Sequence, residues 1–147
     1  MSEQKYDAQI GKVESTMLGV EDHGILTAVL MFDFGASGQG TPGFGLDSHI
    51  KHTRYEGKYD DGSGEHSRVG SAYGMEFVRR LLLACGVDRW EDLKGRTVFV
   101  LRDDGDPYGY IKGIRPLPTE RGTEFIFDDL TVIAAIERED AELAPHV

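Results

Sequence analysis

Residues 25–34 read ILTAVLMFDF, the stretch of this chain that most strongly predicts a β-strand. Its apolar residues occupy both odd and even positions, so we expect a central strand covered on both faces. Residues 12–18 (KVESTML) predict a second strand, and residues 19–24 (GVEDHG) between the two predict a turn. The two strands should therefore form a β-hairpin whose connection is longer than two residues.

A second hairpin is predicted further along the chain. Residues 97–101 (TVFVL) are rich in β-branched and aromatic residues, and residues 108–114 (YGYIKGI) return with alternating character. The turn-forming residues 103–107 (DDGDP) separate the two segments. Residues 125–136 are expected to hold one or two more strands.

One main helix is predicted, over residues 71–85. Ser71 can cap its first free N–H groups, and Gly86 is a typical C-terminal stop. Asp88 and Glu91 have the spacing of a capping box, which predicts a short helical turn. The apolar residues of the main helix form a single stripe, made of Phe77, Val78, Leu81, Leu82 and Cys85.

These elements together predict an α+β fold, an antiparallel β-sheet built from hairpins with one main α-helix packed on it. The length of 147 residues suits one domain. Residues 1–9 are polar and expected to be flexible, and residues 10–136 are expected to form the single α+β domain. Residues 137–147 form an acidic C-terminal tail.

The composition limits the classes of function. The chain has 16 basic and 26 acidic side chains, a net charge of −10, which makes binding to long nucleic acid unfavourable. A single cysteine, Cys85, excludes an internal disulfide framework and is expected to pack as a small apolar residue. No apolar run approaches the ~18–20 residues of a membrane helix, and no secretory leader is recognisable, so we expect a cytoplasmic protein without membrane association.

Glycine accounts for 19 residues, and five of them lie in residues 35–45 (GASGQGTPGFG), which we expect to lack regular structure. The G-x-G-x-x-G pattern within this segment lacks the helix that a dinucleotide site requires. Its backbone N–H groups could still form an anion-binding concavity, or its glycines only shape a bulged connection. The candidate ligand-binding residues of this segment are Gly35, Ser37, Gly38, Gln39 and Gly40.

Aromatic and basic side chains interleave over residues 51–59. Stacking combined with positive charge is how a nucleobase or a single strand is held, which makes Arg54 and Tyr55 candidate ligand-binding residues. Residues 49–119 carry 12 basic and 11 acidic side chains, so an anionic ligand is better tolerated there than at the ends of the chain. His23, in the first predicted turn, is a further candidate, and an exposed polar strand face is the alternative explanation of the 51–59 pattern.

No catalytic residue, metal or cofactor is assigned. A zinc site needs about four converging ligands, which scattered histidines and one cysteine do not supply. Paired carboxylates occur only in predicted turns, at Glu21 and Asp22 and at Asp103, Asp104 and Asp106. Turn carboxylates are usually solvated or bind their own backbone, so they are weak candidates for acid–base catalysis.

Four segments occur in a recognisable order: GVEDHGI at 19–25, GASGQG at 35–40, RVGSAYGMEF at 68–77 and GVDRWEDLKG at 86–95. In combination they are similar to a family of small, functionally uncharacterised proteins of tailed phages and prophages. The resemblance covers about residues 12–115. It implies that the protein acts in an infected bacterial cytoplasm, and it transfers no catalytic residue.

We therefore expect a non-enzymatic phage accessory protein that counters a host defence. Its partner would be a nucleotide-like anionic ligand sequestered near the glycine segment, or a basic host protein that it occludes. Two alternatives stay open: a replication-associated module that binds single-stranded nucleic acid, and a small hydrolase or transferase that uses turn carboxylates. An exposed hairpin edge would also allow a homo-oligomer.

Overall fold

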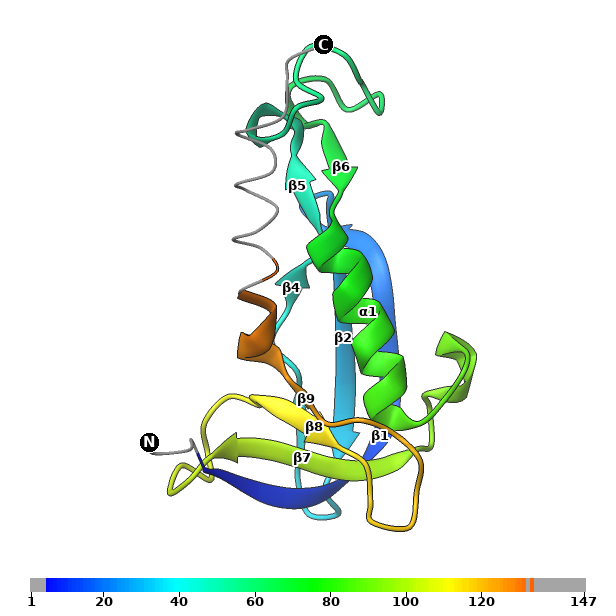
Figure 1. Cartoon of the computed structure of the whole chain (residues 1–147), viewed down its shortest axis with the longest axis vertical. Coiled ribbons are helices and arrows are strands. Elements are labelled where there is room, and N and C mark those ends of the chain that lie inside the picture. Colours follow the sequence, from blue (N-terminus) through cyan, green and yellow to red (C-terminus); the bar gives the residue numbers. More distant parts are fainter. Residues whose placement is uncertain (1–4, 132, 134–147) are drawn as a thin grey trace.

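The computed structural model describes residues 5–131 and 133, apart from the side chain of His52. Within this range one antiparallel sheet contains β1 (Tyr6–Asp22), β2 (Ile25–Asp33), β3 (Gly38–Gly40), β4 (Phe44–Gly45), β7 (Thr97–Asp103), β8 (Gly113–Arg115) and β9 (Phe125–Ile126). A separate ribbon is formed by β5 (Asp47–His49) and β6 (Arg68–Gly70), and the main helix is α1 (Ala72–Cys85). Short 3₁₀ turns are η1 (Ile50–His52), η2 (Gly64–His66), η3 (Trp90–Asp92) and η4 (Phe127–Asp129). The predicted α+β fold is confirmed (Figure 1).

β1 is a long strand that changes partner along its length. Residues 12–22 pair with β2, and residues 6–12 pair with β7. At the change of partner Gly11 has no room for a side chain, because a Cβ there would lie 2.8 Å from the ring of Phe34. A register shift follows after Val13, which is typical of a bulge that bends a strand. As a result β2 and β7 run in clearly different directions (Figure 1).

The hydrogen-bonded path through the sheet is β3-β2-β1-β7-β8-β9, and β4 also pairs with β2. Along the chain, α1 lies between the strands on the outer edge of β2 and strand β7. Strand β1, at the centre of this path, therefore joins β2 and its edge strands to β7, β8 and β9. Connectivity by itself does not indicate a function, because such folds host many functions.

Helix α1 has the ends that the sequence predicts. Ser71 Oγ accepts a hydrogen bond from the Gly74 N–H and donates one to the Leu46 carbonyl, both at 2.9 Å. Gly86 ends the helix in the left-handed conformation, with φ 68°.

No helix of the described residues is both long and apolar enough to cross a membrane. Aromatic rings from four segments, with centroids 5.0 to 5.8 Å apart, pack at the centre of the core: Phe44, Phe77, Phe125 and Phe127.

The expectation that β2 is covered on both faces is wrong. Ala28, Leu30 and Phe32 point into the core and are at most 1% exposed. Met31, which points to the opposite face, is 39% exposed. Successive side chains of a strand alternate between faces, and α1 covers only one face of this part of the sheet (Figure 1).

Several boundaries differ from those predicted. Residues 6–9, expected within a flexible N-terminus, are the first part of β1, because they pair with a strand more than 90 positions away. The return strand of the second hairpin begins only at Gly113, so residues 108–112 belong to the connection. Within the predicted range 125–136, the described residues 125–131 and 133 contain one strand, β9, which a 3₁₀ turn follows. The acidic tail, residues 137–147, lies outside the described part of the chain.

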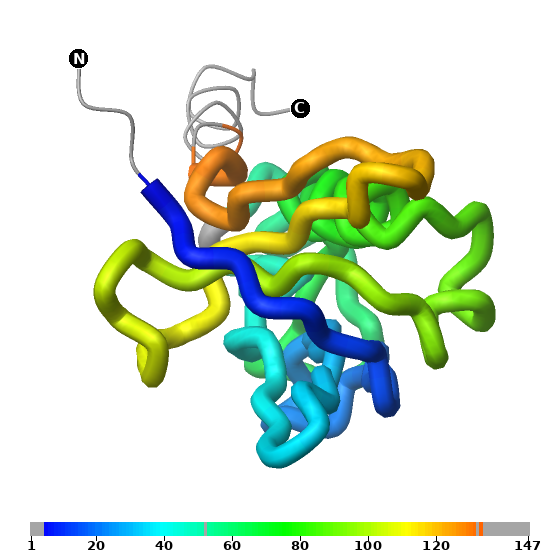
Figure 2. Tube along the Cα trace, turned by 90° about the horizontal axis from the view of Figure 1, so that it is seen from below, coloured from blue at the N-terminus to red at the C-terminus, as the bar shows by residue number. Residues whose placement is uncertain are grey.

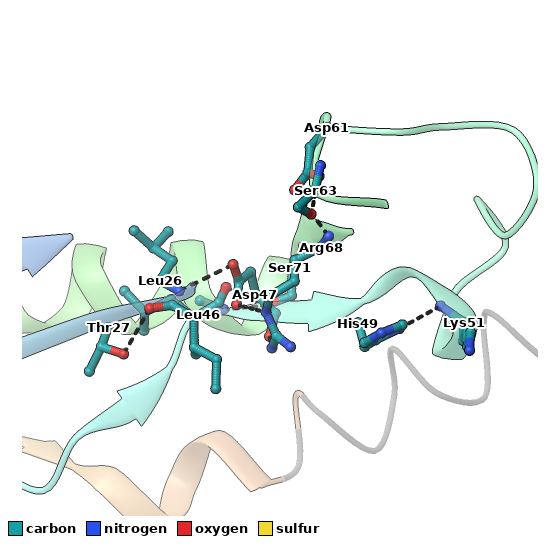
Figure 3. Close-up of polar contacts among 12 residues, drawn as sticks. Leu26, Thr27, Leu46, Asp47, His49, Lys51, Asp61, Ser63, Arg68 and Ser71 are labelled. Atoms are coloured by element: carbon teal, nitrogen blue, oxygen red, sulfur yellow. Dashed lines mark hydrogen bonds and ion pairs between the residues drawn. The ribbon is translucent and has the colours of Figure 1, made fainter. Parts of the chain in front are cut away.

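Residues 47–70 form a lobe at one end of the molecule, here called the distal lobe (Figure 1). At its base, Arg68 Nε donates to Asp47 Oδ1 at 2.7 Å, and the two side chains are 20% and 10% exposed. The other Asp47 oxygen accepts a hydrogen bond from the Leu26 N–H at 3.2 Å (Figure 3). Asp47, paired with Arg68, therefore ties the distal lobe to β2.

Candidate binding surface

The glycine-rich residues 35–45 are ordered, which corrects the expectation that they lack regular structure. They contain β3 and β4, which pair with the two ends of β2. The turn before β3 is closed by the Phe34 N–H, which donates to the Ser37 carbonyl at 2.8 Å. Gly35 in this turn has φ 97°, a conformation that favours glycine.

Glycines of this segment lie beside outward-facing side chains of β2. A Cβ at Gly40 would lie 2.6 Å from the sulfur of Met31, and a Cβ at Gly45 would lie 3.3 Å from a methyl group of Ile25. Because Gly40 and Gly45 have no side chains, the side chains of Met31 and Ile25 can lie against β3 and β4. Packing therefore explains these two glycines without a ligand.

Gln39 makes contacts inside the protein rather than with solvent. Its amide nitrogen donates to the Gly109 carbonyl at 3.0 Å, and its oxygen accepts from Arg102 Nε at 3.1 Å. Arg102 is 6% exposed, donates from Nη1 to Gln9 Oε1 at 2.7 Å, and lies over the Phe34 ring, 4.9 Å from its centroid. Burial lowers the pKa of the guanidinium, whose hydrogen bonds go to neutral amides. Gln39 thus connects β3 to two distant segments.

The remaining candidates lie far from the candidate residues 35–40. His23 sits at the β1–β2 turn with φ 53°, and its Nδ1 is 2.8 Å from Asp22 Oδ1. The nine residues of β2, at about 3.3 Å each, place this turn about 30 Å from the turn before β3. Arg54 lies over the Tyr55 ring at 5.5 Å in the distal lobe. The structure therefore does not bring the predicted ligand-binding residues together in one site.

Two carboxylates of the distal lobe accept hydrogen bonds from residues of their own loop. Asp60 Oδ1 accepts hydrogen bonds from the Gly62 N–H and the Ser67 hydroxyl, both at 2.8 Å. Asp61 Oδ1 accepts hydrogen bonds from the hydroxyl of Ser63 and, at 2.9 Å, from its N–H. These hydrogen bonds lower the pKa of both carboxyl groups, as expected where the ionised form is the acceptor.

Neither metal nor thiol chemistry gains support from the geometry. The described residues contain no group of three or more His, Cys, Asp or Glu side chains arranged to hold a metal ion. Cys85 is 1% exposed, and burial raises the pKa of its thiol to about 12. At neutral pH Cys85 is therefore a protonated, inaccessible thiol and a poor nucleophile.

The most exposed aromatic side chains lie where the sequence predicted a strand. Tyr108 is 96% exposed and Tyr110 is 75% exposed. Both lie in residues 104–112, the connection between β7 and β8, here called the tyrosine loop, which projects from the side of the molecule (Figure 2). The alternation of residues 108–114 conceals this exposure. The available signal was the turn sequence DDGDP directly before two tyrosines.

Hydrogen bonds hold the tyrosine loop from two sides. The Gly105 N–H donates to Asp7 Oδ2 at 3.1 Å, which ties the loop to β1. The Gln39 amide donates to the Gly109 carbonyl at 3.0 Å, which ties it to β3. Within the loop the Gly109 N–H donates to the Asp106 carbonyl at 3.2 Å. The exposed tyrosines are therefore carried by a braced segment of backbone.

Carboxylates outnumber ammonium groups in and around the tyrosine loop. The acidic residues there are Asp7, Asp103, Asp104 and Asp106. The basic residues there are Lys5, Lys112 and the buried Arg102. The surface thus combines aromatic side chains with net negative charge, which favours a cationic partner over an anionic one.

Comparison of the chain with protein-family models, with curated proteins and with solved structures gave no match.

Proposed function

We propose that this chain is a non-enzymatic binding protein that uses the tyrosine loop to occlude a basic protein. The observation that carries the proposal is the exposure of Tyr108 and Tyr110, 96% and 75%, on a loop braced from β1 and β3. Tyrosine is among the residues that most often dominate binding energy at protein interfaces. Its large ring has few rotatable bonds, so it adds contact area at a small entropic cost.

The bracing of the loop supports recognition. A flexible loop must be ordered when it binds, which weakens the complex, whereas a preformed loop avoids most of that cost. Asp7 accepts a hydrogen bond from Gly105, before the two tyrosines, and Gln39 donates one to Gly109, between them. These bonds give the tyrosine loop the character of a preorganised binding element.

The charge distribution favours a basic protein over a nucleotide-like ligand. The net charge of the chain is −10, and the tyrosine loop region is itself acidic. The side chain of Gln39, the candidate anion ligand of the glycine segment, is engaged with Arg102 and Gly109. Of the two modes expected from the sequence, the geometry thus supports occlusion of a protein more than sequestration of an anion.

The resemblance to phage proteins supplies a setting for this proposal. A phage accessory protein acts in the infected bacterial cytoplasm, where many defence proteins handle nucleic acid and carry basic surfaces. An acidic protein with an aromatic anchor would compete for such a surface through complementary charge. We therefore propose that occlusion of a basic host protein counters a host defence.

The test measures binding of a fluorescent, lysine- and arginine-rich peptide to the full chain by anisotropy. We expect the double substitution Tyr108→Ala/Tyr110→Ala to weaken binding by at least about tenfold. The matched control is Tyr55→Ala/Tyr59→Ala in the distal lobe, where the side chains are 40% and 50% exposed. The control variant should bind the peptide like the parent protein.

A second arm uses a short oligothymidylate. Exposed aromatic side chains commonly stack on the bases of single-stranded nucleic acid, so this ligand tests the main alternative. Binding of oligothymidylate that the tyrosine substitutions abolish, without peptide binding, would replace our proposal with a nucleic-acid-binding function. Absence of peptide binding at low salt would also refute the proposal.

A further inference from the structure

We infer that the tyrosine loop recognises an arginine side chain of its partner, held between Tyr108 and Tyr110 at the carboxylate of Asp106. The inference rests on the proposed function and names the anchor of that interaction. Its starting point is Gly109, which separates the two tyrosines. A Cβ at Gly109 would lie 2.2 Å from Asp106 Oδ2 and 3.1 Å from Oδ1. The carboxylate therefore lies directly against the backbone between the two exposed aromatic residues.

The backbone of Asp106 is held in place, and its carboxylate is available. The Asp106 N–H donates to the Asp103 carbonyl at 3.0 Å, and the Asp106 carbonyl accepts from Gly109, so the backbone of this residue is fixed. Its side chain makes no hydrogen bond or ion pair with any residue that the structure describes. By contrast, Asp7, on the neighbouring strand, uses its carboxylate to hold Gly105. The carboxylate oxygens of Asp106 are thus available to accept hydrogen bonds from a ligand.

The combination of groups selects the chemistry of the ligand. A carboxylate that lies against the backbone between two exposed tyrosines attracts a cation and repels a phosphate. A guanidinium can pair with the carboxylate through two parallel N–H groups and can stack its flat face on a tyrosine ring. An ammonium offers a single, strongly hydrated charge and no flat face. Arginine therefore makes use of both parts of the site, and lysine does not.

The glycine between the tyrosines is part of this arrangement. Any larger residue at position 109 would occupy the space of the Asp106 carboxylate. The carbonyl of Gly109 is held by Gln39, which in turn accepts a hydrogen bond from Arg102. The glycine segment therefore contributes to recognition indirectly, by fixing the backbone on which the site is built.

The test compares three labelled peptides that differ at one position, which holds arginine, lysine or the uncharged isostere citrulline. We expect the arginine peptide to bind about threefold to tenfold more tightly than the lysine peptide, and the citrulline peptide to bind most weakly. Asp106→Asn should weaken the arginine peptide about tenfold and remove its advantage over lysine. The matched control, Asp104→Asn, removes the same charge from the same exposed loop and should preserve that advantage.

The outcomes separate the two proposals. Equal affinities for the arginine and lysine peptides, or equal effects of Asp106→Asn and Asp104→Asn, would overturn the arginine site while leaving a loop that binds basic segments. If the parent protein bound none of the basic peptides, the proposed function itself would be overturned. Both substituted residues are exposed, so circular dichroism and thermal unfolding should match those of the parent protein.

Discussion

Replacement of Gly74 by alanine tests how α1 is seated on the rest of the fold. Helix propensity alone predicts that Gly74→Ala stabilises a helix by about 1 kcal/mol. The structure predicts the opposite result. A Cβ at Gly74 would lie 1.9 Å from the Leu46 carbonyl oxygen and 2.6 Å from its carbonyl carbon. Because these are backbone atoms, no rotation of a side chain can relieve the clash.

The size of the effect follows from this geometry. The Leu46 oxygen would have to retreat from 1.9 Å to at least 3.0 Å, a displacement of about 1.1 Å. That movement would break the 2.9 Å hydrogen bond from Ser71 Oγ to the same carbonyl, a loss of about 1 kcal/mol. Overpacking costs about 1–3 kcal/mol more, so the net destabilisation should be about 2 kcal/mol after the gain in propensity.

Urea unfolding followed by circular dichroism measures this difference directly. We expect a lower midpoint with an unchanged slope, and a melting temperature lowered by about 4–8 °C. Gly70→Ala is the matched control, since a Cβ at Gly70 would meet nothing within 4 Å and its stability should change little. A Gly74→Ala protein as stable as the parent would refute the close approach of α1 to Leu46.

Three further predictions concern the interior and the distal lobe. Burial raises the pKa of the Cys85 thiol from 9.0 to about 12 in the folded protein. As pH rises, the unfolded chain therefore loses this proton at a lower pH than the folded protein does. The contribution of Cys85 to the free energy of unfolding should therefore fall by about 1.4 kcal/mol per pH unit across that interval, and Cys85→Ala should remove this dependence. The buried Thr41 accepts the Leu30 N–H at 3.1 Å, so Thr41→Val should cost about 1–2 kcal/mol in urea unfolding, whereas Thr41→Ser should cost less than half of that. Asp47→Ala leaves Arg68 without its ion-pair partner and should cost about 2 kcal/mol, with faster hydrogen exchange in the distal lobe; unchanged exchange would contradict the anchoring role of this pair.

Local signals in the sequence were sufficient for the individual elements. The apolar stripe of residues 71–85, with Ser71 before it and Gly86 after it, predicted α1 and both of its ends. Residues 25–34 predicted β2, and the order of strand-like segments predicted an antiparallel sheet with one helix. These signals are reliable because side-chain periodicity and end caps are set by neighbours within a few positions.

Signals from the sequence were weaker for the candidate binding surface. The composition of the glycine segment predicts a ligand loop, but two of its glycines are explained by their packing against β2. The alternation of residues 108–114 predicts a strand that would include Tyr108 and Tyr110. Their exposure depends on where β8 begins, and strand boundaries are decided by pairing partners rather than by local pattern.

The sequence by itself determined the fold class, the helix with its caps, the acidic charge and the buried character of the single cysteine. Only the tertiary structure decided that β1 pairs with two strands, that Gln39 meets Arg102 from 63 positions away, and that the tyrosine loop is braced and exposed. The physical reason is the range of the interactions. Caps and periodicity act between neighbours, whereas strand partners, buried hydrogen bonds and exposure depend on which distant segments meet once the chain has folded.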